Sequence, residues 1–349
     1  MKTALSILGW IAVVGTLAPL LHTDKWWIRI FDFPRPQLLA LGILAVVGLL
    51  ATHNFRSMGV PARTLALSLL AACGYQMYRI LPYLPVFSPQ VLATSDASLR
   101  SPVSLLVANV LMTNRKAAEF LELVKREEPD VVLVVETDDW WEKQLRSLET
   151  EYRHHLKCPL DNTYGILFYT RLELVDSEIR FLLEDDIPSV YARIRLPRGE
   201  LVDFYGLHPE PPSTFQDTDE RDAELLLVGR EAKNASHPVI VAGDLNDVAW
   251  SHTTRLFQRT SGLLDPRIGR GMYNTYHADL PFLRLPIDHV FHSADFHLVE
   301  MKRLGHFGSD HFPIFIQLDL EPRKVERQPT PQPDQEDLEE AEEMIEKER

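Results

Sequence analysis

Carboxylate, amide and imidazole side chains follow or precede several short apolar runs of this sequence. Glu136 follows VVLVV, Asp244 follows VIVAG, and Asp310 with His311 precedes PIFIQL. Carboxylate oxygens are the ligands that Mg²⁺ and Mn²⁺ prefer, and the sequence has neither a cysteine cluster nor an HExxH helix for zinc. The pattern therefore predicts a site for a magnesium-type (or manganese) ion.

Three further polar residues occupy comparable positions. Asn109 follows SLLVA, His208 follows DFYGL, and Asn246 lies two residues beyond Asp244. A single Asn, Asp or His at a strand end usually caps a turn. Because several strand ends share this character and none carries Lys or Arg, we expect them to meet in one pocket.

The chemistry that suits these groups is hydrolysis of a phosphate ester. A divalent ion polarises a phosphoryl oxygen, and attack by water then needs a base. His311 is the natural candidate because imidazole titrates near neutral pH, and Asp288 is placed to orient it. A serine nucleophile at Ser309 is the alternative, but the sequence lacks a GxSxG elbow.

The motifs NVLMTN, VVET, GLHPEPP, AGDLND, PIDHVF and GSDHFP occur in this order along the chain. Together they resemble the endonuclease/exonuclease/phosphatase superfamily over residues 101–320. The resemblance implies an α/β fold, a four-layer sandwich of two packed mixed β-sheets flanked by helices. It also implies a metal-dependent phosphoesterase.

Carried over to this sequence, the resemblance assigns the metal to three residues. Glu136 would be the principal ligand, Asp310 would complete or neighbour the site, and Asn109 would hold the ion or the phosphate. Clustered carboxylates repel one another at low effective dielectric, so we expect either a bound Mg²⁺ (or Mn²⁺) or raised carboxylate pKa values.

The resemblance also implies the catalytic roles. Asp244 and Asn246 would position the attacking water and a phosphoryl oxygen. His311 with Asp288 would act as base or transition-state stabiliser, and His208 would assist the leaving group. Asn246 and His208 would also contact the substrate. Separately from the resemblance, Arg270 in the arginine-containing segment 251–271 is predicted to contact the substrate.

Seven short runs rich in β-branched and aromatic residues are predicted to be the strands that position these groups. We expect one helix to begin after Thr113-Asn114 and reach Glu127, and another over 219–232. The predicted strands are 105–108, 131–135, 165–169, 201–207, 239–242, 287–291 and 314–318.

Apolar stretches near the start of the chain predict three transmembrane helices, over about residues 4–21, 36–55 and 64–80. Trp26 and Trp27 suit the membrane interface between the first two. A cleaved signal peptide and buried core helices are the alternatives. We expect a multi-pass protein of the cell membrane, with an extracytoplasmic catalytic part.

The remaining organisation follows from composition. Residues 81–100 contain prolines and a polar stretch, and are predicted to be a linker to the catalytic domain at 101–320. Residues 321–349 are acidic and proline-rich, and are predicted to be a disordered tail with at most a frayed helix from Asp334.

The substrate is the least determined property. The net charge of −14 disfavours a broad nucleic-acid surface, although four arginines in 251–271 offer a local cationic patch. An endonuclease-like hydrolase is our first expectation. The alternatives are a sphingomyelinase-like or inositol-phosphatase-like hydrolase of phospholipid head groups, and a non-catalytic scaffold. A membrane transporter is disfavoured, because the apolar stretches contain hardly any polar groups.

Overall fold

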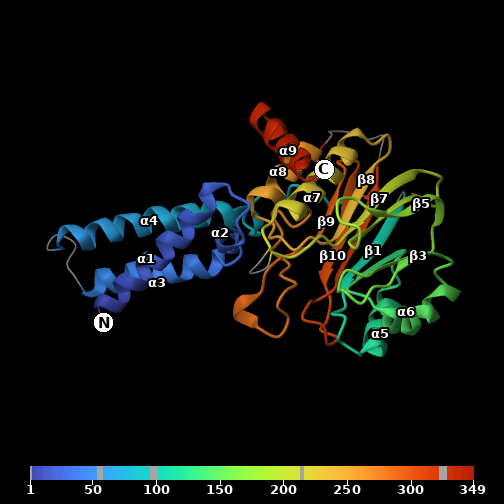
Figure 1. Cartoon of the computed structure of the whole chain (residues 1–349), viewed down its shortest axis with the longest axis horizontal. Helices are drawn as coiled ribbons and strands as arrows, with labels where there is room; N and C mark the ends of the chain where they lie inside the picture. Colours follow the sequence, from blue (N-terminus) through green and yellow to red (C-terminus); the bar gives the residue numbers. More distant parts are fainter. Residues whose placement is uncertain (1, 53–57, 95–100, 213–215, 322–327) are drawn as a thin grey trace.

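The structure is a computed structural model that describes residues 2–52, 58–94, 101–212, 216–321 and 328–349. It is elongated, with a helical bundle at one end and a body that contains the sheets at the other (Figure 1). Parts of three predictions lie outside the described residues, namely 53–55 of the second apolar stretch, 95–100 of the linker and 322–327 of the tail.

Two mixed sheets form the body. One has six strands in the order β10-β11-β1-β2-β4-β3, and the other has five in the order β5-β6-β7-β8-β9. The strands are β1 (Pro102–Asn109), β2 (Val131–Val135), β3 (His154–Cys158), β4 (Ile166–Thr170), β5 (Glu173–Phe181), β6 (Pro188–Arg195), β7 (Leu201–Leu207), β8 (Val239–Asp244), β9 (Asp288–His292), β10 (Phe296–Arg303) and β11 (Ile314–Leu320).

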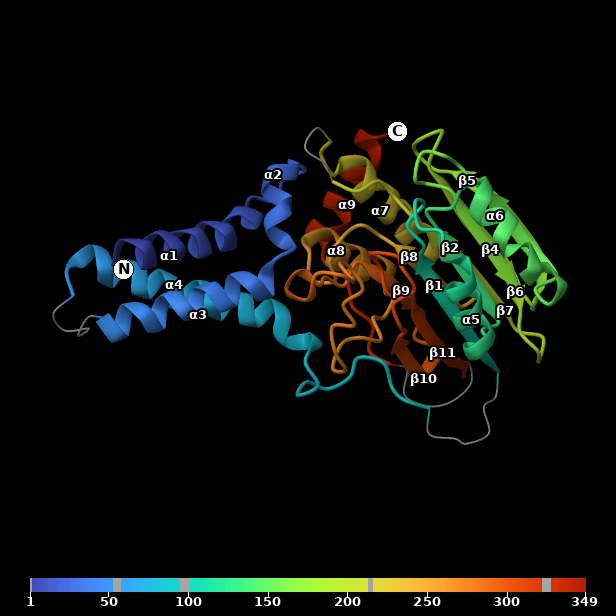
Figure 2. The ribbon, with the colours of Figure 1, turned by 90° about the horizontal axis from the view of Figure 1, so that it is seen from below.

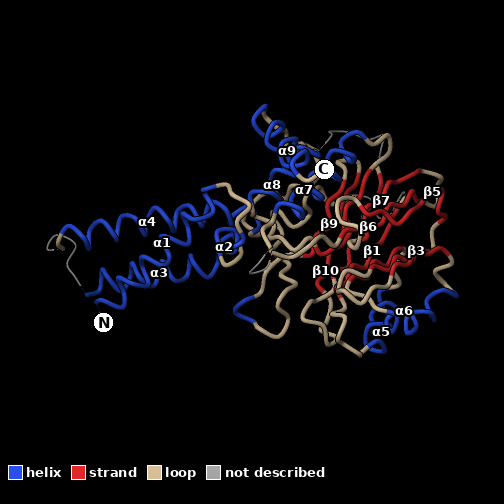
Figure 3. Tube along the Cα trace, viewed as in Figure 1, coloured by secondary structure: helices blue, strands red, loops and turns tan. Residues whose placement is uncertain are grey.

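Helices cover the outer faces of both sheets, which gives the expected four layers (Figures 2 and 3). A core that includes Leu133, Phe168 and Phe204 fills the space between the sheets. The body helices are α5 (Ala117–Glu127), α6 (Asp139–Leu145), α7 (Asp219–Asn234) and α8 (His252–Ser261), with 3₁₀ helices η5 (Arg146–Thr150) and η6 (Pro281–Leu283). α5 and α6 pack on the first sheet and α7 and α8 on the second. Each buried aliphatic or aromatic side chain contributes about 1.5–3 kcal/mol.

All seven predicted strands are present, and those at 131–135 and 201–207 have the predicted bounds. The sequence analysis missed β3, β5, β6 and β10, which mix apolar with charged residues. β3, β5 and β10 lie at sheet edges, where one side of the strand stays polar. The helix expected from Thr113-Asn114 begins later, at Ala117.

The bundle consists of α1 (Lys2–Leu17), α3 (Arg35–Thr52) and α4 (Val60–Ile80), which pack against one another. Two segments, Thr3–Leu21 and Arg35–Thr52, are long and apolar enough to cross a membrane. The third expected span lies within α4, which does not pass the same test, so two candidate spans are found in the described residues rather than three. Short helices connect the bundle to the body: η1 (Ala18–Leu21), α2 (Trp26–Arg29), η2 (Ile30–Asp32) and η4 (Leu81–Tyr83).

A buried ion network joins the bundle to the body. The Arg29 guanidinium on α2 donates to Thr253 Oγ1 at 2.9 Å, and its Nη2 lies 3.4 Å from Asp222 and 3.7 Å from Asp247. All three charged side chains are at most 5% exposed. Close by, Trp250 Nε1 donates to the Asp32 carbonyl oxygen at 2.8 Å. The connecting helix α2 therefore supplies a cation to a cluster whose acids Asp222 and Asp247 belong to the body.

Residues 81–94 are packed against the body rather than forming a free linker. Val91 is fully buried in the core between the sheets, and the backbone around Leu92 and Ala93 pairs with Leu298 of β10. Tyr83 donates its hydroxyl to the Ala249 carbonyl oxygen at 2.6 Å. Apolar residues such as Tyr83 and Val91 anchor this segment, although its prolines predicted a linker.

The expectation of a disordered tail is corrected for residues 335–347, which form helix α9 (Gln335–Lys347). Ala341 and Ile345, four residues apart on one face, are buried against the helices of the second sheet. Around them Asp337 binds Arg259 through two 2.7 Å bonds, and Glu340 lies 2.7 Å from His252 Nε2. Ion pairs thus supplement a small apolar contact that composition alone does not reveal.

We predict that Arg29→Met destabilises the protein by about 3–5 kcal/mol, because it leaves the buried carboxylates of Asp222 and Asp247 with one neighbouring arginine, Arg221, in place of two. Thermal unfolding of the full chain in detergent micelles measures the effect. The matched control is Arg198→Met on the exposed β6–β7 turn, which should change stability by less than about 0.5 kcal/mol. Equal losses for the two variants would contradict the role of the network.

We predict that acid loosens α9. The hydrogen bonds from Arg259 hold the pKa of Asp337 below its usual range, and the bond to His252 does the same for the pKa of Glu340. A lowered carboxylate pKa adds stability above the ordinary value and loses it as the pH falls through the lowered one. Hydrogen-exchange protection of α9 should therefore fall below about pH 4, before that of β1. Protection that persists in α9 as long as in β1 would oppose this.

Candidate active site

The polar strand ends come together because of the sheet topology. β1 and β2 are parallel, so Asn109 and Glu136 lie at the same edge, and the segment with His311 leads into β11, which is antiparallel to β1. In the second sheet β8 and β9 are antiparallel, and Asp244 is the register partner of Asp288. The polar residues at these strand ends of both sheets therefore meet at one site between the two sheets.

Asn109 connects the two sheets at this site. Its Nδ2 donates to Glu136 Oε1 at 2.7 Å and to Asp244 Oδ2 at 3.0 Å. Its Oδ1 accepts from the Leu111 backbone nitrogen at 2.9 Å. The amide therefore uses both of its donor hydrogens on carboxylates, which fixes the spacing of the two acids.

His311 stands on the other side of Asp244. Its Nδ1 lies 2.8 Å from Asp288 Oδ2, and its Nε2 lies 3.6 Å from Asp244 Oδ2.

Ser309, the alternative nucleophile, donates its hydroxyl to the Asn109 carbonyl oxygen at 2.8 Å and accepts from the His311 backbone nitrogen at 3.0 Å. Ser309 is thus engaged in holding the loop. The chain of contacts from Glu136 through Asn109 and Asp244 to His311 makes this one site.

The remaining predicted residues approach Asp244 from a third direction. His208 Nε2 lies 3.9 Å from Asp244 Oδ2. The Asn246 backbone nitrogen donates to Asp244 Oδ1 at 3.0 Å, while its side chain donates to the Pro209 carbonyl oxygen at 2.9 Å. Asn246 therefore ties the loop after β8 to the loop that carries His208.

Two of the site residues have a strained backbone. Glu136 and Asn246 have positive φ angles of 58° and 50°, which cost energy for residues other than glycine. Gly243, next to Asp244, has φ 151°, and a Cβ there would lie 1.8 Å from the Leu207 carbonyl oxygen. Glycine alone fits that position, and the strained residues aim their side chains into the site.

Burial raises the pKa of both central carboxyl groups. The pKa of Glu136 is raised by desolvation, although the Asn109 amide and the His311 charge oppose the shift. The pKa of Asp244 is raised to about 6 by desolvation and by the neighbouring Asp288, against the pull of His311. Negative charge is therefore incompletely compensated here, which favours an additional cation.

The two imidazoles are shifted in opposite directions. Desolvation lowers the pKa of His208, which is fully buried. Desolvation also opposes the charged form of His311, but Asp288 and Asp244 outweigh it and raise its pKa to about 10. The site thus contains one neutral imidazole and one imidazolium at neutral pH.

The donor set suits a hard divalent cation. The atoms Asp310 Oδ1 and Asp288 Oδ1 are buried and have no hydrogen-bond partner among the described residues. Ligand atoms of Asp244, Asp288 and His311 lie within 4.8 Å of one another. Glu136, predicted from the sequence to bind the metal with Asp310, is joined to this group through the Asn109 amide, which donates to both Glu136 and Asp244.

The arginines proposed as a cationic patch are used inside the protein. Arg267 is fully buried and pairs with Asp265 at 2.8 Å, while Arg259 binds α9. Arg270, the predicted substrate contact, donates to the carbonyl oxygens of Val91 at 2.6 Å and Pro266 at 3.3 Å. The structure therefore places Arg270 at the junction with residues 81–94 rather than among the acids.

Two tyrosines that the sequence analysis missed border the site. The Tyr276 ring centroid lies 5.0 Å from that of His311, and the Tyr164 ring lies 5.8 Å from that of His208. The hydroxyl of Tyr164 donates to Glu210 at 3.1 Å. No strand-end pattern marks either residue, because both lie in loops, although Tyr164 is close in sequence to β4.

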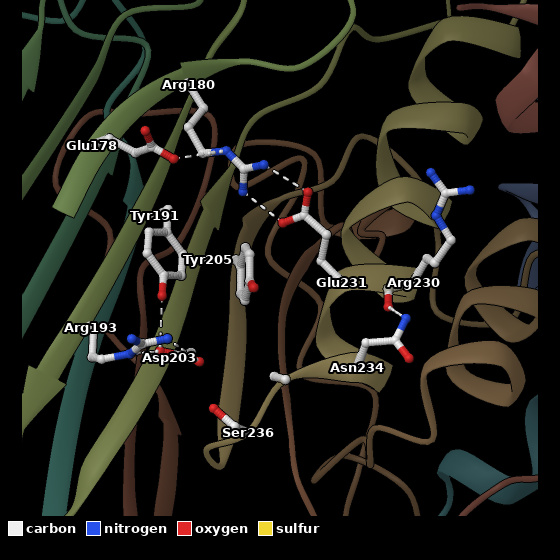
Figure 4. A pocket seen from close by; sticks show the side chains of 11 residues that line it. Glu178, Arg180, Tyr191, Arg193, Asp203, Tyr205, Arg230, Glu231, Asn234 and Ser236 are labelled. Atoms are coloured by element: carbon white, nitrogen blue, oxygen red, sulfur yellow. Dashed lines mark hydrogen bonds and ion pairs between the residues drawn. The ribbon is translucent and has the colours of Figure 1, made fainter. Parts of the chain in front are cut away.

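A cavity of about 590 Å³ lies elsewhere, on the outer face of the second sheet beside α7 (Figure 4). Its cations are already paired: Arg180 donates to both Glu231 oxygens at 2.7 Å, and Arg193 donates to Asp203 at 2.7 Å. Because these arginines and acids neutralise one another, the charged pairs in this cavity differ from the incompletely compensated carboxylates around Asp244.

Solved structures share this fold at low sequence identity. A humanized D. rerio TDP2 has a TM-score of 0.53 and 20% identity, covering 63% of this chain and 100% of that chain. An endonuclease/exonuclease/phosphatase from Beutenbergia cavernae has a TM-score of 0.52 and 17% identity, covering 64% and 72%. The human Nocturnin catalytic domain has a TM-score of 0.52 and 15% identity, covering 63% and 94%.

Sequence comparison finds curated relatives and a matching family. UPF0294 proteins of two Vibrio cholerae strains are 29% identical over 136 residues, which is 38% of this chain and 45% of those proteins. The match therefore spans less than half the length of these curated relatives. The sequence profile of the Endonuclease/Exonuclease/phosphatase family matches residues 106–311, more than half of the chain. The protein belongs to this family of phosphoric ester hydrolases.

Proposed function

We propose that this protein is a membrane-anchored, divalent-metal-dependent phosphoesterase that hydrolyses phosphodiester bonds by attack of an activated water. The observation that carries the proposal is the bridge from Glu136 through Asn109 to Asp244, which holds two buried carboxylates at a fixed spacing beside an imidazolium. Membership of a family of phosphoric ester hydrolases supports it.

Glu136, Asp310 and Asn109 are the residues that would hold Mg²⁺ or Mn²⁺. Their oxygens match what these ions prefer, and Asp310 Oδ1 is buried without another partner in the described chain. Such an ion supplies Lewis-acid polarisation of a phosphoryl oxygen. Its positive charge also offsets the desolvation that raises the Glu136 pKa.

Asp244 is the group best placed to orient the water and accept its proton. Its carboxylate is held on both oxygens, by Asn109 and by the Asn246 backbone, and lies 3.6 Å from His311. Asp288 fixes the His311 ring through Nδ1, so Nε2 faces the reacting phosphate as a donor. Of the two roles expected for His311, the contacts favour transition-state stabilisation.

His208 completes the arrangement from the opposite loop. It is fully buried and neutral because desolvation lowers its pKa, so it has one N–H to donate. A donor at that place stabilises charge on the phosphoryl or leaving oxygen. Asn246, tied to the same loop through Pro209, contacts the substrate in our proposal.

Membrane anchoring is supported by the way the bundle exposes its apolar side chains. Only 33% of the residues in either candidate span are buried, whereas the core helix of a water-exposed protein would be mostly buried. Ile11, Leu44 and Leu67, from α1, α3 and α4, are 48%, 67% and 57% exposed. Lipid satisfies such outward faces. Because α1 packs against both other helices, we propose that it is retained rather than cleaved.

We predict that the full chain hydrolyses bis(p-nitrophenyl) phosphate with Mg²⁺ and loses this activity with EDTA. Glu136→Gln and His311→Ala should each lower turnover at least about a hundredfold, since each removes a charged group that acts on the reacting phosphate. Steady-state rates in detergent measure both effects. The control Glu149→Gln alters a carboxylate on η5 that pairs with Lys157, and should behave as wild type. Wild-type turnover by both site variants would refute the mechanism.

We predict that Asp288→Asn lowers kcat at least about tenfold with a smaller change in KM, because the amide does not hold the His311 ring and its charge as the carboxylate does. The measurement is the separate effect on kcat and KM with the soluble diester. Asp176→Asn on the exposed edge strand β5 is the matched control. An equal fall in kcat for both variants would show a general effect instead.

A further inference from the structure

The loop between Tyr276 and Leu285 has an exposed apolar tip. At this tip Leu280, Phe282 and Leu283 are 46%, 89% and 52% exposed, and residues 281–283 form the short helix η6. The tip protrudes from the body on the side of the helical bundle (Figure 3). A cluster of large apolar side chains in water is costly and typically marks an interaction surface.

The base of this loop is attached to the active site. Tyr276 and Leu285 pair with each other, and Tyr276 also bridges to His311. The Ala278 backbone nitrogen donates to the Asp310 carbonyl oxygen at 2.6 Å. The loop therefore rests on the two neighbouring residues that contribute a proposed metal ligand and the catalytic imidazole.

The tip touches the beginning of a bundle helix. Gln37, in the first turn of α3, donates from Nε2 to the Phe282 carbonyl oxygen at 2.8 Å. Further along α3, Ile43, Leu44 and Val47 are 48%, 67% and 58% exposed. The apolar tip thus lies beside the first turn of a helix that exposes apolar side chains further along and is long enough to cross a bilayer.

We infer that the tip of this loop enters the interfacial layer of the bilayer beside α3, and that the substrate is the phosphate ester of a membrane phospholipid head group. This inference rests on the proposed phosphoesterase function and on its membrane anchor. The occupant is lipid because the tip contacts the first turn of α3, the helix whose exposed apolar face we propose to lie against lipid. Aromatic and aliphatic side chains such as Phe282 and Leu283 bind at that depth.

The geometry brings the catalytic groups within reach of a head group. Tyr276 contacts His311, and Phe282 lies six positions further along the chain. Six fully extended residues span at most about 20 Å. A loop that turns through η6 spans less. The backbone of the tip therefore lies within about 20 Å of Tyr276, the residue whose ring contacts the His311 ring.

The charge distribution agrees with a lipid substrate better than with a nucleic acid. The net charge is −14, and three of the four arginines of residues 251–271 are bound to protein groups: Arg259, Arg267 and Arg270. A long polyanion needs several free cations along a groove. A single lipid head group needs only the active site and a path from the bilayer to that site.

The test uses the full chain reconstituted in vesicles of phosphatidylcholine, phosphatidylglycerol and sphingomyelin. The double variant Phe282→Ser/Leu283→Ser should hydrolyse lipid at least about tenfold more slowly than wild type, because it removes the apolar contact with the bilayer. Its rate on bis(p-nitrophenyl) phosphate should stay within about twofold, which also shows that the variant folds. Phe181→Ser, on edge strand β5 where Phe181 is 46% exposed, is the matched control and should match wild type on both substrates.

A second measurement reports contact with lipid without relying on activity. With Cys73 and Cys158 replaced by serine, Phe282→Cys is labelled with an environment-sensitive dye and exposed to nitroxide-bearing lipids. The dye at position 282 should be quenched, and a dye introduced through Phe181→Cys should not be. Equal quenching at the two positions would overturn the insertion of the loop.

The substrate arms separate failure of this inference from failure of the proposed function. Hydrolysis of the soluble diester or of single-stranded DNA without hydrolysis of any lipid would overturn the lipid substrate and leave the phosphoesterase intact. DNA belongs in the panel because D. rerio TDP2, which shares the fold at 19% identity, has been solved with a single-strand DNA product. No hydrolysis of any of these substrates would overturn both proposals.

Discussion

The burial of several acids at one edge of two sheets is the constraint on which the rest of this site depends. Asp244 and Asp288 are each 1% exposed and are register partners on adjacent strands, so neither can turn away from the other. Close carboxylates in a desolvated place are stable only with donors, protons or cations around them. The Asn109 amide supplies hydrogen-bond donors to these acids. The imidazolium of His311 and the proposed metal supply positive charge.

The same constraint explains why strain is found here. Glu136 and Asn246 adopt positive φ angles, and Gly243 tolerates a contact that no side chain could make. Such conformations persist where the surrounding sheets overdetermine the backbone. The stable sandwich thus supports an arrangement of charges that a flexible loop could not maintain.

The sequence predicted much of this site because strand ends are local features. A polar residue after an apolar run marks the end of a strand, and the parallel pairing of β1 with β2 then brings Asn109 and Glu136 together. Polar edge strands such as β5 left no such signal, since their residues face water as often as the core. Arg270 was misjudged because a free arginine and one bound to backbone oxygens look alike in sequence.

Amino-acid composition also did not show which parts of the chain pack against one another. Helix α9 contains few apolar residues and prolines interrupt residues 81–94, yet Ile345 and Val91 are buried by surfaces distant in sequence. Burial of this kind depends on partners that only the folded chain supplies. For the same reason the network around Arg29 was invisible, because its acids come from residues 222 and 247.

That network sets an order for the assembly of the protein. Arg29 is synthesised long before Asp222 and Asp247, so the connection between the helices is present when the body emerges from the ribosome. Asp222 and Asp247 then fold against a chain in which Arg29 is already present. Without Arg29, Arg221 alone would have to balance the charge of these two acids. Balance of these buried acids in the body therefore depends on the docking of α2, so the fold of the body is coupled to the placement of the segment that leads from the N-terminal helices.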